Sequence, residues 1–233
     1  MTGLARAHGG GPPRIPAVRG LSLASAGGHD GGVSSAEWDS RYAGTELIWT
    51  AEPNRFVEAE LRDLPPGRAL DIGAGEGRNA VWLASRGWQV TAVDFSAVGL
   101  DKGRRLAASR GISVDWVHAD VRSYQPGAGA FQLVLIAYLQ LLAAELTGVL
   151  RGAVRALGPG GTLLVVGHDV DNLTEGAGGP QDPAVLYTPE LITRSLDGLT
   201  VLRAERVRRP LLSGDTTKQA VDTLVRAVRP APS

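Results

Sequence analysis

Three closely spaced glycines between two carboxylates carry the clearest chemical signature in the sequence. They lie in segment 69–79, which reads ALDIGAGEGRN and continues a short apolar run. Glycines allow a tight backbone turn and let a ligand approach the main chain closely. A dinucleotide-binding loop places its third glycine five positions after the first, whereas Gly77 follows Gly73 by four, and Asp71 and Glu76 would repel a pyrophosphate. The spacing therefore disfavours a nicotinamide dinucleotide and indicates a different ligand.

Another carboxylate, Asp94, closes a second apolar run at residues 89–94. Open parallel sheets bind ligands beyond the carboxyl ends of their strands. An ionised carboxylate also offers several acceptor sites for two neighbouring hydroxyl groups. The position predicts that Asp94 binds the sugar hydroxyls of a ligand. The alternative role is a cap for the helix that follows.

A histidine and an aspartate, His168 and Asp169, end a later apolar run. An imidazole takes a proton from a hydroxyl group near neutral pH, and a nearby carboxylate orients it. Neighbouring residues of a strand point to opposite faces, so this pair requires a bend after Gly167. The alternative is a strand-end histidine with only local hydrogen bonds. Tyr138, which follows the run 131–137, is a further candidate for the same site.

No metal site is predicted. His168, Asp169 and Asp171 would supply oxygen and imidazole ligands, but they stand without further ligands beside them. The chain has no cysteine, which excludes disulfides, a thiolate nucleophile and zinc–thiolate sites. His118, at the end of the third apolar run, is expected to be structural.

Apolar runs and helical patterns alternate along the chain and define the fold class. Strands are predicted at 68–72, 89–94, 114–118, 131–137 and 162–168. Helices are predicted at 79–86, 97–109 and 141–157, before the glycine-rich turn 158–161, and from Pro189 to Leu196 with Thr188 as the cap. Two alternating runs at 199–207 and 218–228, with 211–217 between them, predict an antiparallel pair. The expected fold is α/β, a Rossmann-like doubly wound sheet that is mostly parallel with an antiparallel edge hairpin.

The composition divides the chain into a tail and one domain. Residues 1–32 hold nine glycines, three prolines and no aromatic residue, so a disordered N-terminal tail is expected over 1–33. A single domain is expected over 34–230. It opens with a helical lid segment, 34–64, in which Ser34 and Glu37 form a capping-box pattern and Pro53 begins a second helix. The long connection 169–187 is expected to be a lid or specificity loop.

Charge and hydropathy exclude several kinds of partner. Lysine and arginine total 24 and so do aspartate and glutamate, which gives a formal net charge of zero. This balance disfavours binding to nucleic acid or to an anionic membrane surface. No apolar run is long enough to span a bilayer. The expected partner is a small molecule, the expected location is the cytoplasm, and both a monomer and a homodimer remain open.

Four motifs in order resemble those of the class I S-adenosylmethionine-dependent methyltransferases. Asp71, Gly73, Gly75 and Gly77 match the D-x-G-x-G-x-G motif of that family. The other three are Val93-Asp94-Phe95-Ser96, Ala119-Asp120-Val121 and Leu157-Gly158-Pro159-Gly160-Gly161-Thr162-Leu163. The resemblance covers residues 68–168 and implies the family's seven-stranded fold. Residues 77–84 and 87–90, together with the lid segment around Trp38-Asp39-Ser40-Arg41-Tyr42, are similar to the tellurite-resistance and thiopurine-type branch. Gln132 departs from the pattern, since many relatives carry an acid there.

The resemblance implies S-adenosylmethionine as the cofactor and S-adenosylhomocysteine as the product. The residues expected to hold it are Trp49, Asp71, Gly73, Ala74, Gly75, Gly77, Arg78, Asn79, Asp94, Phe95, Asp120, Val121 and Ala137. Asp94 would bind the ribose, Asp120 and Val121 the adenine, and Arg78 the methionine carboxylate. The alternatives are a satisfied loop carboxylate for Asp71, a turn residue for Asp120 and an exposed helix arginine for Arg78.

The resulting hypothesis is in-line methylation of a small molecule, such as a sugar or another metabolite, at a hydroxyl group. His168, Asp169 and Tyr138 are the candidate catalytic residues, with His168 as the base. Methylation of a soft sulfur or nitrogen acceptor and a cofactor-binding module without catalysis are the alternatives. A nucleic-acid or protein methyltransferase is disfavoured, because residues 137–140 read AYLQ where an N-P-P-Y-type sequence would stand.

Overall fold

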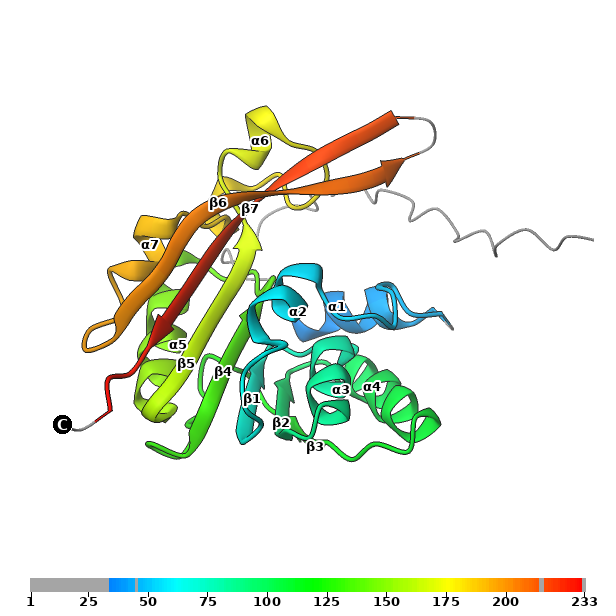
Figure 1. Cartoon of the computed structure of the whole chain (residues 1–233). Helices are drawn as coiled ribbons and strands as arrows, with labels where there is room; N and C mark the ends of the chain where they lie inside the picture. The colour runs from blue at the N-terminus through cyan, green and yellow to red at the C-terminus, as the bar shows by residue number, and fades with distance from the viewer. Residues whose placement is uncertain (1–33, 45, 214–215, 232–233) are drawn as a thin grey trace, which may run out of the picture.

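The computed structural model describes residues 34–44, 46–213 and 216–231 (Figure 1). The predicted N-terminal tail, residues 1–33, lies outside the described residues. The helices are α1 (Ser35–Tyr42), α2 (Arg55–Leu61), α3 (Arg78–Ser85), α4 (Ala97–Ser109), α5 (Ala143–Ala156), α6 (Asn172–Glu175), the 3₁₀ helix η1 (Pro183–Val185) and α7 (Pro189–Thr193). The strands are β1 (Arg68–Ile72), β2 (Gln89–Asp94), β3 (Asp115–His118), β4 (Phe131–Ala137), β5 (Leu157–His168), β6 (Thr200–Ser213) and β7 (Thr216–Val228).

The seven strands form one sheet in the order β3-β2-β1-β4-β5-β7-β6. The first five run parallel, whereas β7 pairs antiparallel with both β5 and β6. Parallel neighbours require a crossover connection, and the helices that alternate with the strands supply it. The predicted doubly wound sheet with an antiparallel edge hairpin is confirmed.

Helices cover both faces of the sheet, which is why its central strands are almost wholly apolar. On one face, Leu70 of β1 and Ile136 of β4 pack into a cluster with Leu150 of α5 and Ile192 of α7. On the other face, the neighbouring residue Ala69 joins a cluster with α2 and α3. Figure 1 shows α3 and α4 side by side on this second face. The two clusters fix the register of β1, since a slip by one residue would exchange them.

Local sequence signals explain how the lid segment folds. The predicted capping box forms at α1, where the Glu37 amide donates to Ser34 Oγ and the Ser34 amide donates to Glu37 Oε2. The second helix begins two residues later than predicted. Pro53 lies outside the helix and Asn54 is its N-cap, because the Asn54 side chain accepts hydrogen bonds from the amides of Phe56 and Val57.

Two predicted boundaries near the C-terminus are corrected. Strand β5 begins at Leu157, and the expected turn 158–161 forms an irregularity within it: the partner of Phe131 is Leu157, but the partner of Leu133 is already Thr162. The hairpin of β6 and β7 also extends through the expected connection 211–217, with Ser213 opposite Thr216. It therefore runs past the end of β5 (Figure 1).

Proline is compatible with this longer hairpin because β6 is an edge strand, so Pro210 removes no hydrogen bond from a central ladder. Within the described residues, no helix has the length and hydropathy needed to cross a membrane.

Candidate active site

A cavity of about 330 Å³ opens at the carboxyl end of the parallel strands. Its walls come from the glycine loop after β1, the lid segment, the residues after β4, and the extended part of β6. The predicted cofactor residues that line it are Trp49, Gly73, Ala74, Gly75, Arg78, Asn79, Phe95, Asp120, Val121 and Ala137. Of the predicted catalytic residues, His168 and Tyr138 line it and Asp169 does not. The predicted cofactor residues that do not line it are Asp71, Gly77 and Asp94.

The glycine loop needs glycine at each motif position. Gly73, Gly75 and Gly77 all have positive φ angles, between 55° and 75°. A Cβ atom on Gly75 would lie 2.6 Å from the hydroxyl oxygen of Tyr42, and one on Gly77 would overlap the Trp116 ring. Tyr42 of the lid segment and Trp116 of β3 thus approach the loop so closely that a side chain at Gly75 or Gly77 does not fit.

Asp94 holds this loop in place. Its Oδ2 accepts a hydrogen bond from the Gly75 amide and its Oδ1 from the Ser96 amide, each at 2.8 Å. Burial raises the pKa of Asp94, and the backbone hydrogen bonds oppose that rise. The cap of α4 is Ser96, whose hydroxyl accepts the Gly99 amide, so Asp94 is not the helix cap.

Two charged side chains beside the loop, Asp71 and Arg78, test whether the site fits the amino-acid group of the cofactor. Asp71 is 1% exposed, and its Oδ2 atom has no hydrogen-bond partner among the described residues. Burial and the neighbouring Asp94 raise the pKa of Asp71 to about 7, while Arg78 opposes the rise. Arg78 lines the cavity with its guanidinium 5.6 Å from the Trp49 ring centre. In the described part of the chain, no carboxylate forms an ion pair with it. An unsatisfied carboxylate and an unsatisfied cation fit the ammonium and carboxylate of a methionine group.

The lid segment is fastened to the loop by Glu76 and Asn79, of which the sequence assigned only Asn79, and that as a cofactor-binding residue. Glu76 accepts the Ile48 and Trp49 amides, each at 3.1 Å, and forms an ion pair with Lys102 at 3.0 Å. Asn79 accepts the Asn54 amide at 2.9 Å. The sequence placed Glu76 only as a flanking charge, because no local pattern links it to a lysine on α4.

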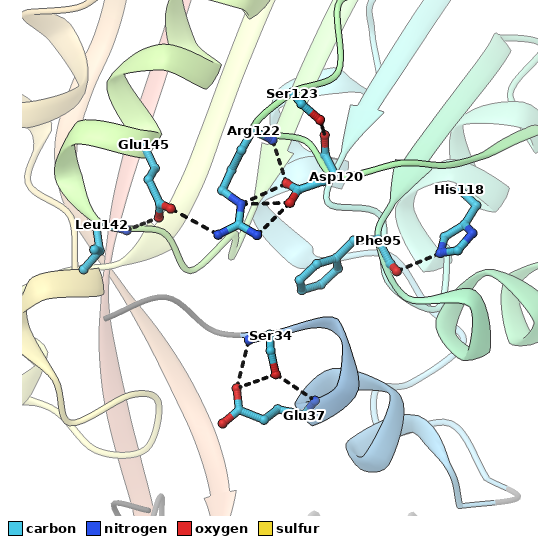
Figure 2. A network of polar contacts seen from close by, with 9 residues as sticks. All are labelled: Ser34, Glu37, Phe95, His118, Asp120, Arg122, Ser123, Leu142 and Glu145. Atoms are coloured by element: carbon cyan, nitrogen blue, oxygen red, sulfur yellow. Dashed lines mark hydrogen bonds and ion pairs between the residues drawn. The ribbon is translucent and has the colours of Figure 1, made fainter. Parts of the chain in front are cut away.

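Asp120 is not a free acceptor. Its two oxygens contact the Arg122 guanidinium, which also bonds Glu145 at the start of α5 (Figure 2). Arg122 holds the pKa of Asp120 below its usual value. Figure 2 also shows His118, whose Nε2 contacts the carbonyl oxygen of Phe95 at 2.9 Å.

The predicted pairing of His168 with Asp169 does not occur. The buried Asp169 carboxylate accepts hydrogen bonds from the Thr223 hydroxyl and from Arg206 Nε, which places it on the other side of the strand. The carboxylate beside His168 is Asp222 of β7, whose Oδ1 lies 3.3 Å from His168 Nδ1. Asp222 stands directly opposite His168 in the β5–β7 ladder. The sequence signal that could have identified Asp222 is an acidic residue inside the largely apolar run 220–225.

Tyr138 and Arg209 complete this end of the cavity. The Tyr138 hydroxyl donates to Asp222 Oδ2 at 2.8 Å and accepts from Asn54 Nδ2 at 3.3 Å. Burial and the charge of Asp222 raise the pKa of Tyr138, so the phenol stays protonated and acts as a donor. Arg209 Nε donates to the same Oδ2 atom at 2.9 Å. Tyr138 is the one non-glycine residue with a positive φ, 57°, in the described chain, which indicates local strain at this site.

The 169–187 loop supplies no lining residue of the cavity. It contacts the site from behind, since a Cβ atom on Gly179 would lie 2.9 Å from the His168 ring. Its two ends are joined by a bridge between Asp169 and Tyr187. Among the described residues, no group of three or more histidines and carboxylates is placed to hold a metal ion.

The fold is that of the class I methyltransferases. The sheet order, with β7 antiparallel between β5 and β6, is that of the class I methyltransferase Rossmann-like fold. Residues 69–161 match the family model described as a methyltransferase domain. The solved structure of a SAM-dependent methyltransferase from Methanosarcina mazei has this fold, with a TM-score of 0.61 and 16% identity over 78% of this chain.

Curated relatives match about half of the chain. A demethylmenaquinone methyltransferase of Thermus thermophilus is 34% identical over 125 residues, which is 53% of this chain and 55% of the relative. A tRNA 5-carboxymethoxyuridine methyltransferase of Escherichia coli is 32% identical over 46% of this chain and 42% of its own length. The chain thus spans about half the length of these curated relatives.

Solved structures agree on the fold. One from work on the conversion of a disulfide bond into a thioacetal group during echinomycin biosynthesis has a TM-score of 0.69, with 19% identity over 85% of this chain and 93% of its own. Identity at this level supports the fold alone. The narrower resemblance to the tellurite-resistance and thiopurine-type branch stays a prediction.

Proposed function

We propose that this protein transfers a methyl group from S-adenosylmethionine to a hydroxyl group of a small molecule, with His168 as the general base. The observation that carries the proposal is the position of the imidazole. His168 lines the same cavity as the glycine loop, and its Nδ1 atom faces a buried carboxylate. This orientation leaves Nε2 as the ring nitrogen available to an acceptor.

The bound cofactor would supply an electrophilic methyl group carried on a sulfonium. When the S–CH3 bond breaks, its electron pair stays on sulfur. The chain's own part is to align the acceptor, exclude water and take one proton. The acceptor oxygen uses an electron pair to form the new C–O bond, and its proton passes to Nε2 of His168. Asp71 and Arg78 would hold the amino-acid end of the cofactor, while Asp94 fixes the glycine loop through the Gly75 amide.

The charges on β6 favour a small acceptor over nucleic acid. Each of its arginines pairs with a carboxylate in the described chain, so together they form no free basic stripe. The pairs are Arg203 with Glu60, Arg206 with Asp169, Arg208 with Glu175 and Arg209 with Asp222. Neutralised side chains release few counterions from a phosphate backbone. Because the chain is similar to a tRNA methyltransferase, tRNA must be included among the acceptors that are tested.

The first experiment is calorimetric titration of the full chain with S-adenosylhomocysteine, and with NAD as a control. We expect binding of S-adenosylhomocysteine alone, with loss of binding in Asp94→Ala. Transfer of labelled methyl is then measured on hydroxyl, thiol and amine acceptors and on tRNA. We expect labelled hydroxyl products, with a rate ~10²–10⁴-fold lower in His168→Ala and unchanged S-adenosylhomocysteine affinity. Label only in thiols, amines or tRNA, or wild-type turnover by His168→Ala, would overturn the proposal.

A further inference from the structure

We infer that Asp222 is the positioning residue of this site: it holds His168 as the Nδ1–H tautomer, and Tyr138 and Arg209 fix the carboxylate that does so. This inference deepens the proposed function and rests on it for its catalytic meaning. The tautomer of His168 can be measured without any methyl transfer, so this part of the inference is tested independently of the proposed function.

Two buried atoms without other partners carry the argument. His168 Nδ1 and Asp222 Oδ1 are both buried, and neither has a hydrogen-bond partner among the described residues. They lie 3.3 Å apart, slightly beyond an ideal hydrogen bond, with side-chain exposures of 12% and 0%. A buried polar atom without a partner is unfavourable, so we expect the imidazole and the carboxylate to pair with each other.

The other oxygen of Asp222 explains why Oδ1 is reserved for the histidine. Oδ2 already accepts hydrogen bonds from the Tyr138 hydroxyl and from Arg209 Nε. These two donors come from the residue after β4 and from β6, on either side of the β5–β7 pair, and they fix the rotation of the carboxylate. Oδ1 is thereby aimed at the residue opposite in the ladder, which is His168.

The charge state of Asp222 determines which partner carries the proton. Burial opposes its ionisation, but the His168 imidazole and the Arg209 guanidinium outweigh burial and hold the pKa of Asp222 below its usual value. An ionised carboxylate only accepts hydrogen bonds, so Nδ1 must be the donor. Nε2 is then unprotonated and carries the lone pair that a base needs.

The groups around the ring leave Asp222 as its one carboxylate contact in the described chain. Tyr138 packs edge-on with ring centres 4.9 Å apart, and the backbone of Gly179 covers the ring from the 169–187 loop. Arg209 reaches the site through Asp222. Asp169, although adjacent in sequence, is bonded to Arg206 and Thr223.

The catalytic consequence is a balanced proton transfer. When the acceptor O–H bond breaks, Nε2 takes the proton and the electron pair of oxygen forms the C–O bond. The positive charge that arises on the imidazole is stabilised by Asp222 across Nδ1–H. After transfer, Nε2 releases the proton to water. Loss of this kind of partner puts a histidine in the wrong tautomer, as in the serine-protease triad.

The direct test is imidazole ¹⁵N NMR on the full chain at mildly alkaline pH. The sequence has four histidines, so a His168→Gln variant assigns the signal. We expect Nδ1–H in the wild type and in Asp169→Asn, the matched buried control. Asp222→Asn, whose amide donates to Nδ1, should shift His168 toward Nε2–H. An Nε2–H tautomer in the wild type, or no change in a folded Asp222→Asn, would overturn the inference. The wild-type result decides the matter even if the variant does not fold.

Kinetics on the hydroxyl acceptor found in the methyl-transfer screen separate positioning from general stability. We expect Asp222→Asn to lower turnover ~10²–10⁴-fold in the wild type and less than about threefold in a His168→Ala background. Equal losses in both backgrounds would mean that Asp222 acts without His168. Absence of methyl transfer to every hydroxyl would refute the proposed function, whereas the NMR result tests the tautomer independently.

Discussion

Nζ of Lys102 lies 3.0 Å from Oε1 of Glu76, with both side chains almost wholly buried. The pair joins α4 to the glycine loop, and it also fastens the lid segment. Glu76 accepts the amides of Ile48 and Trp49, and Lys102 donates to the carbonyl oxygen of Glu46 at 2.6 Å. One ion pair thus connects the floor of the cavity to its cover.

Breaking this ion pair should loosen the lid and the loop together. Lys102→Met leaves a buried carboxylate without its cation, for which we expect a loss of ~3–5 kcal/mol in the free energy of unfolding. S-adenosylhomocysteine affinity should fall as well, because Trp49 and the glycine loop share the affected anchor. Urea unfolding and calorimetric titration measure the two effects.

A surface pair provides the control for Lys102→Met. Arg104 and Asp101 form an exposed ion pair on the same helix, so Arg104→Met should change stability by less than about 1 kcal/mol. Adding Glu76→Gln to Lys102→Met should recover part of the loss, since it removes the unpaired charge. Equal destabilisation by Lys102→Met and Arg104→Met would show that the buried pair has no special role.

Asp71 should make the ligand-free protein less stable as the pH rises. Its pKa is raised from 3.8 to about 7 in the folded chain by burial and by Asp94. The folded state therefore binds more protons than the unfolded state between these two values, and the free energy of unfolding falls across that interval. The full effect has an upper bound of about 4 kcal/mol. Chemical denaturation between pH 4 and pH 8 measures it.

Asp71→Asn isolates this contribution. The variant should show a flatter pH dependence and higher stability at pH 8, yet weaker binding of S-adenosylhomocysteine, whose ammonium group would lose its carboxylate. Saturating S-adenosylhomocysteine should flatten the wild-type curve in the same way, since it supplies the missing cation. A variant with unchanged pH dependence would mean that Asp71 is not the titrating group.

The contact between Gly75 and Tyr42 should make the loop intolerant of a side chain. Gly75→Ala adds a Cβ atom 2.6 Å from the Tyr42 hydroxyl, at a backbone φ of 55°. We expect a loss of S-adenosylhomocysteine binding and lower stability. Tyr42→Phe removes the clashing oxygen and should restore part of the binding in the double variant, with about 1 kcal/mol of backbone strain remaining. Purely additive losses would contradict a direct clash.

Local patterns predicted the elements that depend on neighbours in sequence. The bounds of β1, β2 and β4 agree with their apolar runs, and the glycine loop follows from its spacing. The lengths of β6 and β7 were underestimated, because Pro210 and the polar residues near it resemble a connection. Only the pairing of the two strands as an edge hairpin shows that these residues continue the ladder.

The acceptor end was predicted only in part for a related reason. His168 and Tyr138 follow strand ends, where a parallel sheet binds ligands, so the sequence identifies them. Their partners Asp222 and Arg209 lie on β7 and β6, and the register of two antiparallel pairings brings them to the site. Asp169 was chosen because it is adjacent in sequence, but adjacent residues of a strand face opposite sides.

The contact between Gly179 and His168 gives a way to disturb the base without touching the cofactor end. A Cβ atom on Gly179 would lie 2.9 Å from Nδ1 and Cε1 of the ring, so Gly179→Ala should displace the imidazole. Misplacement of a catalytic group by about 1 Å costs ~10²-fold in rate, and we expect a loss of that order in methyl transfer to the hydroxyl acceptor. S-adenosylhomocysteine affinity should be unchanged.

Gly178→Ala is the matched control, because Gly178 has a similar φ of 72° but its Cβ would meet only Leu211, at 3.4 Å. Backbone strain is therefore nearly equal in the two variants, and the difference in their rates reports the displacement of His168. Equal rates in the two variants would show that the 169–187 loop does not position the base.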